Sequence, residues 1–240
     1  MTAPATAAVV TGAARGIGRA IAARLAADHA VVCVDLDPRV TETAAAITAG
    51  GGTAVPVMVD LREDASPAAV AAALDDLAVP LKVLVNNAGI TRDALVTKMS
   101  EDDFCAVLDV NLGAAWALTE HLLDRLVDGA AIVNTSSRSY LGSVGQFNYA
   151  MSKGGLVGLT RALALSLAPR VRVNAVAPGL TATEMTMAMP DDVRDKLVAA
   201  IPLGRMGQPA EIAEVVAALA GDALSYVTGQ VLLACGGRSL

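Results

Sequence analysis

The chain has 240 residues, of which 54% are hydrophobic and 18% are charged, so it is long enough for one domain with a well-buried core. Its net charge is −6 and it has no run of Lys and Arg, which argues against a nucleic-acid partner. The three cysteines lie far apart, which excludes a metal or redox motif built on them and favours a reducing compartment.

No segment is expected to enter a membrane. The first ten residues carry no basic group and lead directly into a glycine-rich turn, unlike a signal peptide. The longest uncharged stretch, residues 43–59, is interrupted by Gly50, Gly51, Gly52 and Pro56. We therefore expect a soluble, cytoplasmic protein.

Short β-branched runs alternate along the chain with stretches rich in Ala and Leu. We predict strands over residues 7–11, 31–35, 55–59, 83–86, 131–135, 171–176 and 230–233, and helices over residues 17–28, 66–77, 102–126, 149–167 and 209–220. The strands are continuously apolar, as strands buried on both faces are. This alternation predicts the α/β class, with a single doubly wound parallel sheet of about seven strands and helices on both faces. We expect one domain over residues 1–240, with its ligands at the carboxyl ends of the strands.

The turn after the first predicted strand is rich in glycine, because Gly12, Gly16 and Gly18 surround Arg15 and Ile17. Glycine lets the backbone turn tightly and approach a pyrophosphate, and the N-terminus of the following helix offers free N–H groups. A glycine cluster alone is common in turns, but its place between a strand and a helix predicts a dinucleotide site.

The end of the second predicted strand bears on the choice of dinucleotide. A carboxylate at Asp35 can accept both hydroxyls of the adenosine ribose while it repels a 2′-phosphate, and Asp37 adds a second negative charge. Arg15 is the opposing signal because it can pair with a 2′-phosphate, although it can also be a solvated loop side chain. We predict NAD(H) as the preferred cofactor, with NADP(H) as the alternative.

Two later strand ends extend this predicted site. Asp60 and Leu61 follow the third strand and are candidates to hold the adenine ring, although an ordinary turn explains them equally well. Asn87, Ala88 and Gly89 follow the fourth strand, where small and amide residues let cofactor and backbone approach closely.

Tyr149 and Lys153 lie four residues apart on a predicted helix, so their side chains share one face. An ammonium beside a phenol favours the phenolate, so we expect the pKa of Tyr149 to fall below its ordinary value near ~10. Such a phenol can give a proton to a carbonyl oxygen or take one from an alcohol. An exposed pair without a chemical role is the alternative, and the other motifs argue against it.

Six motifs spread over essentially the whole chain resemble those of the short-chain dehydrogenase/reductase family. They are residues 11–18, residues 86–89, Asn111, the serines at 136 and 137, Tyr149 with Lys153, and residues 178–183. The resemblance implies a Rossmann fold, a nicotinamide cofactor and oxidoreductase activity. Residues 89–95, 145–149, 201–212 and 226–231 look most like 3-oxoacyl-acyl-carrier-protein reductases and acetoacetyl-CoA reductases.

The resemblance assigns catalytic roles to particular residues. Tyr149 would be the general acid for reduction, and Lys153 would hold the nicotinamide ribose. Asn111 would support a water that links the lysine to solvent, with a buried amide bonded to a helix carbonyl as the alternative. The family serine polarises the substrate carbonyl. Its usual spacing of thirteen residues before the tyrosine gives Ser136, whereas the local pattern at the strand end gives Ser137, which we prefer because loops accept deletions more readily than strand ends.

The segment after the sixth predicted strand resembles the one that holds the nicotinamide carboxamide in this family. It contains Pro178 and Gly179, and its predicted contacts with the cofactor are Thr181 and Thr183. A proline turn without a ligand is the alternative.

The substrate pocket is predicted from three side chains. Residues 180–200 are expected to form a lid, in which Met185 suits a pocket for apolar substrates, although its spacing also fits plain packing. Tyr140, Phe147 and Tyr149 account for three of the six aromatic residues within ten positions. Core aromatics would be spread out, so we predict that Tyr140 and Phe147 shape the pocket.

The function that the resemblance implies is hydride transfer between a nicotinamide and a 3-oxoacyl thioester, carried by CoA or acyl carrier protein, or a related ketone. One alternative is an NAD-dependent dehydrogenase of another secondary alcohol. An alternative of another class is a non-catalytic dinucleotide-binding sensor. The family commonly forms tetramers, so we expect a homotetramer, and we expect no metal, nucleic acid or membrane partner.

Overall fold

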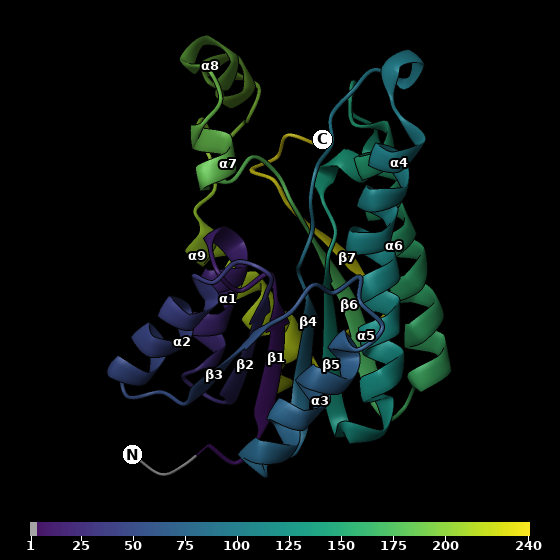
Figure 1. The fold of residues 1–240 in the computed structure, drawn as a ribbon. Helices are drawn as coiled ribbons and strands as arrows, with labels where there is room; N and C mark the ends of the chain where they lie inside the picture. Colours follow the sequence, from purple (N-terminus) through teal and green to yellow (C-terminus); the bar gives the residue numbers. More distant parts are fainter. Residues whose placement is uncertain (1–3) are drawn as a thin grey trace.

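The computed structural model describes residues 4–240 as one sheet covered by helices on both faces (Figure 1). The seven strands are all parallel and follow the order β3-β2-β1-β4-β5-β6-β7. They are β1 (Ala7–Thr11), β2 (Ala30–Asp35), β3 (Ala54–Met58), β4 (Leu81–Asn86), β5 (Leu126–Thr135), β6 (Val171–Pro178) and β7 (Val231–Ala234). The predicted fold class is therefore confirmed, and the order reverses between β1 and β4, the point at which ligands bind in such sheets.

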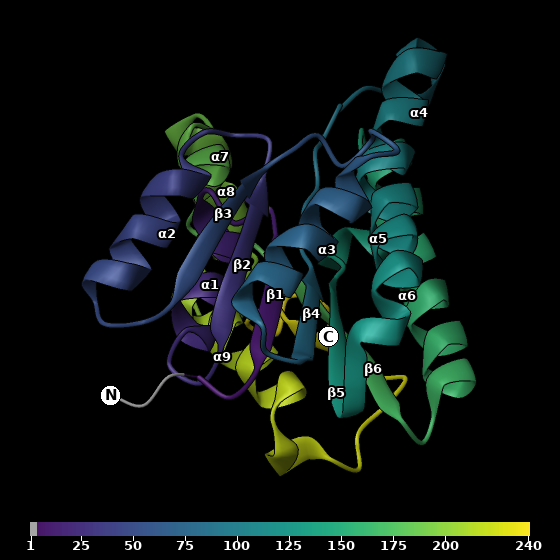
Figure 2. The same ribbon diagram turned by 60° about the horizontal axis from the view of Figure 1, so that its bottom comes forward.

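The helices form two layers and a separate group at one end of the sheet. One layer contains α1 (Gly16–Leu25), α2 (Val40–Ala49) and α9 (Pro209–Ala220), and the other contains α3 (Ser66–Leu77), α4 (Glu101–Leu108), α5 (Ala114–Leu122) and α6 (Phe147–Leu167). The remaining two, α7 (Glu184–Met187) and α8 (Asp191–Ala199), stand at the opposite end of the sheet from the start of β1 (Figure 1; Figure 2). They therefore lie at the carboxyl ends of the strands.

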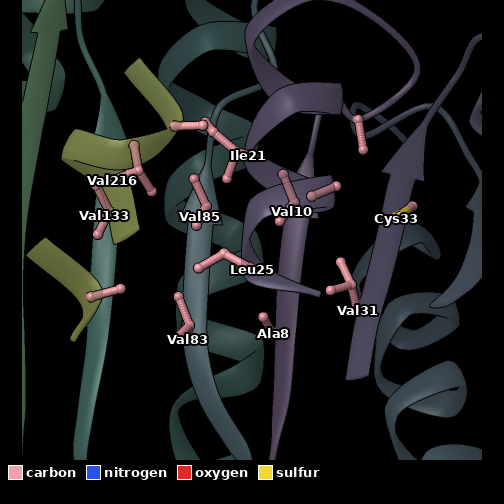
Figure 3. Packing of buried hydrophobic residues seen from close by; sticks show 14 of the residues in the cluster. Ala8, Val10, Ile21, Leu25, Val31, Cys33, Val83, Val85, Val133 and Val216 are labelled. Carbon is pink, nitrogen blue, oxygen red and sulfur yellow. The ribbon is translucent and has the colours of Figure 1, made fainter. Parts of the chain in front are cut away.

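Side chains of each central strand alternate between two hydrophobic clusters. Val10 packs in one cluster with Ile21 of α1 and Val216 of α9 (Figure 3), whereas its neighbour Val9 packs in the other with Leu118 of α5. Both faces of the central strands are buried, so these strands are mostly apolar along their length instead of at alternate positions.

The helix predictions differ from the structure at residues 102–126, at α2, and at α7 and α8, which lie in the predicted lid and were not predicted as helices. The helix predicted over residues 102–126 is interrupted by a π-turn (Asp109–Gly113) between α4 and α5, and β5 already begins at Leu126. Helix α2 is missing from the prediction, although Val40, Ala44 and Ile47 are buried at helical spacing. Its short Thr- and Ala-rich sequence gives a weak helical pattern. Along residues 4–240, none of the helices combines the length and the apolar character needed to cross a bilayer.

Candidate active site

A cleft of about 780 Å³ opens at the carboxyl ends of the central strands. The predicted residues that line it are Gly12, Arg15, Gly16, Ile17, Gly18, Asp35, Asp60, Leu61, Asn87, Ala88, Gly89, Ser137, Tyr149, Lys153, Pro178, Gly179, Thr181, Thr183 and Met185. Residues from the glycine turn, the ends of five further strands, α6 and the lid therefore meet in one space. Asn111, Tyr140 and Phe147 are not part of its lining.

The glycine turn is packed too closely for any side chain. A Cβ on Gly18 would lie 1.9 Å from the carbonyl oxygen of Gly12, and a Cβ on Gly12, whose φ is +68°, would lie 2.8 Å from Nδ2 of Asn87. The Thr11 hydroxyl accepts hydrogen bonds from the backbone N–H groups of Asn87 (2.9 Å) and Ala88 (3.0 Å), which ties the ends of β1 and β4 together. The backbone of the turn therefore faces the cleft directly.

Helix α1 begins in this turn without a side-chain cap. Arg15 is its N-cap residue and has an extended backbone, and no side chain accepts a hydrogen bond from the N–H groups of the first turn. Free N–H groups at a helix N-terminus attract anions. The bare glycine backbone and the uncapped helix together fit the pyrophosphate of a dinucleotide.

The carboxylate of Asp35 is held in position by the backbone. Its Oδ2 accepts a hydrogen bond from the N–H of Ala14 (2.9 Å), and its Oδ1 accepts one from the N–H of Asp37 (3.0 Å). Each oxygen keeps a lone pair, so Asp35 can still accept hydroxyl groups from a ribose. Asp60, by contrast, is paired with Arg62 at 2.5 Å, and this guanidinium lowers the pKa of the Asp60 carboxyl.

The two candidate serines have different environments. The Ser136 hydroxyl is buried and donates a hydrogen bond to the backbone carbonyl of Lys153 at 2.8 Å, which fixes α6 against β5. Ser137 is less buried, accepts a hydrogen bond from the N–H of Ser139 at 3.1 Å, and interacts with the Tyr149 hydroxyl. Both border the cleft, but only the Ser137 hydroxyl is directed at the phenol, which favours Ser137 as the serine that contacts a substrate.

The expected fall in the pKa of Tyr149 is wrong in direction. Burial raises the pKa of this phenol, and the hydrogen bond with Ser137 opposes that rise only in part. The Lys153 ammonium lies 5.7 Å from the centre of the phenol ring and donates to the backbone carbonyl of Thr135 at 2.7 Å. Lys153 is itself buried, and burial lowers its pKa from 10.5 to about 8. Desolvation therefore outweighs the charge of the ammonium.

Asn111 is buried in the π-turn and bonded to the loop after β4. Its Oδ1 accepts the N–H of Ile90 (2.8 Å), and its Nδ2 donates to the carbonyl of Ile90 (3.1 Å) and to the hydroxyl of Ser152 (3.0 Å). The alternative of a bond to a helix carbonyl is wrong, because these partners lie outside its own helix. The side chain holds the loop that places Gly89 and Ile90 on the cleft.

The segment after β6 crosses the cleft and approaches the glycine turn. The N–H of Gly179 donates to the carbonyl of Ala234 (2.9 Å), and the Thr181 hydroxyl donates to the carbonyl of Gly179 (3.3 Å). A Cβ on Gly16 would lie 3.4 Å from the methyl group of Thr183. This segment therefore forms a wall opposite the turn.

The predicted pocket aromatics lie beside the cleft and not in it. Phe147 is 45% exposed and stacks on Phe104 of α4, with ring centres 5.8 Å apart. Tyr140 lies in a short 3-10 turn. The lining residues that sequence reasoning missed are Leu36, Pro38, Val59, Arg62, Ile90, Thr91, Arg92, Ala106, Val110, Thr135, Glu184 and Thr186. Residues 90–92 directly follow the predicted Gly89, so extending the predicted site along the loop after β4 would have included them.

Residues 4–240 contain no group of three His, Cys, Asp or Glu side chains arranged to hold a metal ion.

Comparison with known proteins gives consistent matches along the chain. The family model described as "Enoyl-(Acyl carrier protein) reductase" matches residues 12–239. The protein named 3-oxoacyl-[acyl-carrier-protein] reductase FabG from Thermotoga maritima is 40% identical over 239 residues, with 95% of this chain and 96% of that protein covered. The (3R)-3-hydroxyacyl-CoA dehydrogenase of Mus musculus is 39% identical over 254 residues, with 96% of this chain and 95% of that protein covered. The crystal structure of a dehydrogenase/reductase from Sinorhizobium meliloti 1021 has a TM-score of 0.94 and 34% identity, and the match covers 100% of this chain and 97% of that one.

Proposed function

The chain belongs to the short-chain dehydrogenase/reductase family of nicotinamide-dependent oxidoreductases, and from this premise we propose that it reduces the ketone of 3-oxoacyl thioesters or of related ketones. Relatives at about 40% identity carry names that specify 3-oxoacyl-[acyl-carrier-protein] reduction and 3-hydroxyacyl-CoA dehydrogenation. The observation that carries the proposal is that Ser137, Tyr149 and Lys153 line the same cleft as the glycine turn and Asp35.

The cofactor's place in the cleft follows from the residues that line it. The backbone of the glycine turn and the N-terminus of α1 would hold the pyrophosphate, and Asp35 would accept the hydroxyls of the adenosine ribose. Lys153 would donate to the other ribose, and Thr181 and Thr183 would contact the carboxamide. When bound, the nicotinamide supplies the hydride for reduction and accepts one in the reverse reaction.

The chain's own residues would move the proton. The Ser137 hydroxyl would donate a hydrogen bond to the substrate carbonyl oxygen, and the Tyr149 hydroxyl would give its proton to the same oxygen. Because burial raises the pKa of Tyr149, the phenol keeps its proton at neutral pH. A protonated phenol is the form that reduction needs.

Asn111 would act as a positioning residue. Its amide fixes the backbone of Ile90, and a Cβ on the adjacent Gly89 would lie 3.2 Å from the Nζ of Lys153. The π-turn therefore keeps the loop close to the lysine while it leaves room for a ribose. A water relay from the lysine past Asn111 to solvent remains a prediction.

We propose NAD(H) as the preferred form of the cofactor, with NADP(H) as the second choice. Asp35 is fixed where it would accept ribose hydroxyls, and its charge would oppose a phosphate at that place. Arg15 lies on the same part of the cleft but is paired with Glu184 at 3.4 Å.

The direct test is a comparison of substrates with NADH and NADPH. We expect oxidation of NADH by acetoacetyl-CoA, with a higher kcat/KM than for NADPH or for a simple ketone. A 3-oxoacyl group on acyl carrier protein, assayed beside the CoA thioester, decides between the two carriers. Turnover only with unrelated secondary alcohols would favour the alternative dehydrogenase. NADH binding without oxidation by any ketone would favour the non-catalytic sensor.

We further propose a homotetramer of single-domain subunits, with residues 180–200 as the substrate lid. Trp116 on α5 and Leu165 on α6 are 54% and 85% exposed, which supports burial of these helices against another copy. A cytoplasmic location is part of the same proposal and is supported by three free cysteines, Cys33, Cys105 and Cys235.

A further inference from the structure

The lid is tied to the dinucleotide end of the cleft by one carboxylate. Glu184, the first residue of α7, accepts hydrogen bonds from Nη1 of Arg39 on both oxygens (3.1 and 3.2 Å) and from Nη1 of Arg15 (3.4 Å). Within the described part of the chain, the ion pairs of α8 stay inside that helix. Glu184 is therefore the charged lid residue that reaches the glycine turn and the β2–α2 connection.

Both arginines lie near the place expected for the adenosine ribose, and of the two Arg15 lines the cleft. Arg15 belongs to the glycine turn, and Arg39 precedes α2 just after the Asp35 strand end. Arg39 also pairs with Asp37 at 2.6 Å and lowers the pKa of that carboxyl to about 2, so Asp37 stays ionised at neutral pH. Asp37 and Glu184 thus pair with the two guanidinium groups, and with the neighbouring Asp35 carboxylate the cluster carries a net negative charge.

Guanidinium groups in this position are natural partners for a phosphate on the ribose 2′ oxygen, because they bind phosphate oxygens with charge-assisted hydrogen bonds. Here Glu184 already takes hydrogen bonds from both. A 2′-phosphate would have to displace the Glu184 carboxylate and then remain beside it as a like charge. A ribose with a free 2′ hydroxyl would need neither change.

We propose that Glu184 is a cofactor-specificity residue supplied by the lid, which disfavours NADP(H) by occupying Arg15 and Arg39. The inference rests on the proposed nicotinamide-dependent function and adds a residue to the discrimination assigned there to Asp35. It places part of the choice of cofactor on a segment more than 140 residues away in sequence from the two arginines.

The test is a titration of wild-type protein and of Glu184→Gln with NADH and with NADPH at low ionic strength, in which cofactor fluorescence reports binding. Glutamine keeps the shape of the side chain and removes the charge. We expect the Kd for NADPH to fall about tenfold, which corresponds to ~1.4 kcal/mol, while the Kd for NADH stays within about twofold. The gain should shrink as salt is added, because the cluster is exposed.

Two further variants separate this effect from a general change in charge. Asp192→Asn removes one negative charge from α8, where Asp192 pairs only with Lys196, and should leave both Kd values unchanged. Arg15→Gln with Arg39→Gln, added to Glu184→Gln, should abolish the gain. An NADPH affinity that does not change in Glu184→Gln, that rises equally in Asp192→Asn, or that stays raised without the arginines would overturn the proposal.

These outcomes are separate from those that test the proposed function. A wild-type protein that binds NADPH more tightly than NADH would show the NAD(H) preference to be wrong, and the shift caused by Glu184→Gln would still decide the role of Glu184. Because binding is the readout, a protein that turns over no ketone gives the same decision.

Discussion

Burial sets the protonation state of the two reactive side chains. Lys153 is buried and Tyr149 is half-buried, and in each case burial favours the neutral form of the side chain. For the phenol this favours proton donation. For the lysine it means that a ligand able to accept hydrogen bonds from the ammonium would stabilise its charged form.

Replacing Tyr149 with Phe tests the proton donor. We expect kcat for ketone reduction to fall by a factor on the order of 10²–10⁴, the usual contribution of a positioned acid. NADH affinity should change little, because the proposed cofactor contacts of Lys153 and the glycine turn remain. Steady-state kinetics beside fluorescence titration measure both quantities. Full activity in Tyr149→Phe would contradict the assignment.

The raised pKa of Tyr149 also predicts opposite pH dependence in the two directions. Reduction needs the protonated phenol, so its kcat/KM should stay level through neutral pH and fall only at alkaline pH. Oxidation of the matching 3-hydroxyacyl thioester needs the phenolate and should become faster as pH rises. Initial rates in both directions across one buffer series make the comparison. A reduction rate that already falls between pH 6 and 7, roughly three to four units below an ordinary phenol pKa, would show that the phenol is acidic instead.

Lys153 should make stability depend on pH. Its folded pKa of about 8 lies below the ordinary 10.5, so the unfolded chain binds more protons between these values, and the free energy of unfolding rises with pH across that window. Below about pH 8 the penalty is present in full, and it amounts to about 3 kcal/mol. Urea unfolding of wild type and of Lys153→Met at pH 8 and at pH 10 should show this extra rise only in wild type. Lys153→Met should also lose reductase activity, so stability and function oppose each other at this residue.

A wild-type protein whose stability does not rise relative to Lys153→Met over that range would mean that the lysine is solvated in solution. Cys33 changes the free energy of unfolding with pH in the opposite direction from Lys153, because burial raises the pKa of its thiol to about 12. A thiol protonated more strongly in the folded chain lowers stability as pH rises past its unfolded pKa.

At the scale of elements, the π-turn between α4 and α5 connects the helix layer to the loop after β4. Asn111→Ala leaves the N–H and carbonyl of Ile90 without their side-chain partner, so we expect a loss of about 2 kcal/mol in stability. We also expect a lower kcat, because the loop that carries Gly89 is no longer fixed. Asp109→Asn, at an exposed position of the same turn, is the matched control and should change neither quantity. Equal effects of the two substitutions would show that the turn itself, and not the Asn111 amide, is responsible.

Local pattern was sufficient to predict the strands, because each contains a run of mostly apolar residues, which in the central strands is buried on both faces. It was also sufficient for the glycine turn, whose residues are close in sequence. The π-turn was not predictable, since its stabilising partner, Ile90, is 21 residues away. The pKa of Tyr149 was predicted with the wrong sign because helical spacing reveals a neighbouring charge but not burial. Glu184 escaped notice because its partners lie on the first two strand–helix connections.

At the scale of the whole molecule, the main prediction is that the chain assembles into a homotetramer. We expect sedimentation at micromolar concentration to give a mass four times the 24.2 kDa of the chain. Leu165→Glu places a charge on the exposed face of α6 and should shift the protein to smaller species, since burying an unpaired charge in an interface is costly. Glu214→Gln, a polar change on the exposed side of α9, is the control. A wild-type monomer would refute the assembly.

The segment that follows β7 supports both ends of the lid. A Cβ on Gly179 would lie 2.8 Å from the Cα of Cys235, and the N–H of Leu203 donates to the carbonyl of Gly236 at 3.1 Å. During synthesis, the segment after β6 thus cannot form its wall of the cleft until residue 236 has left the ribosome, long after the glycine turn has emerged.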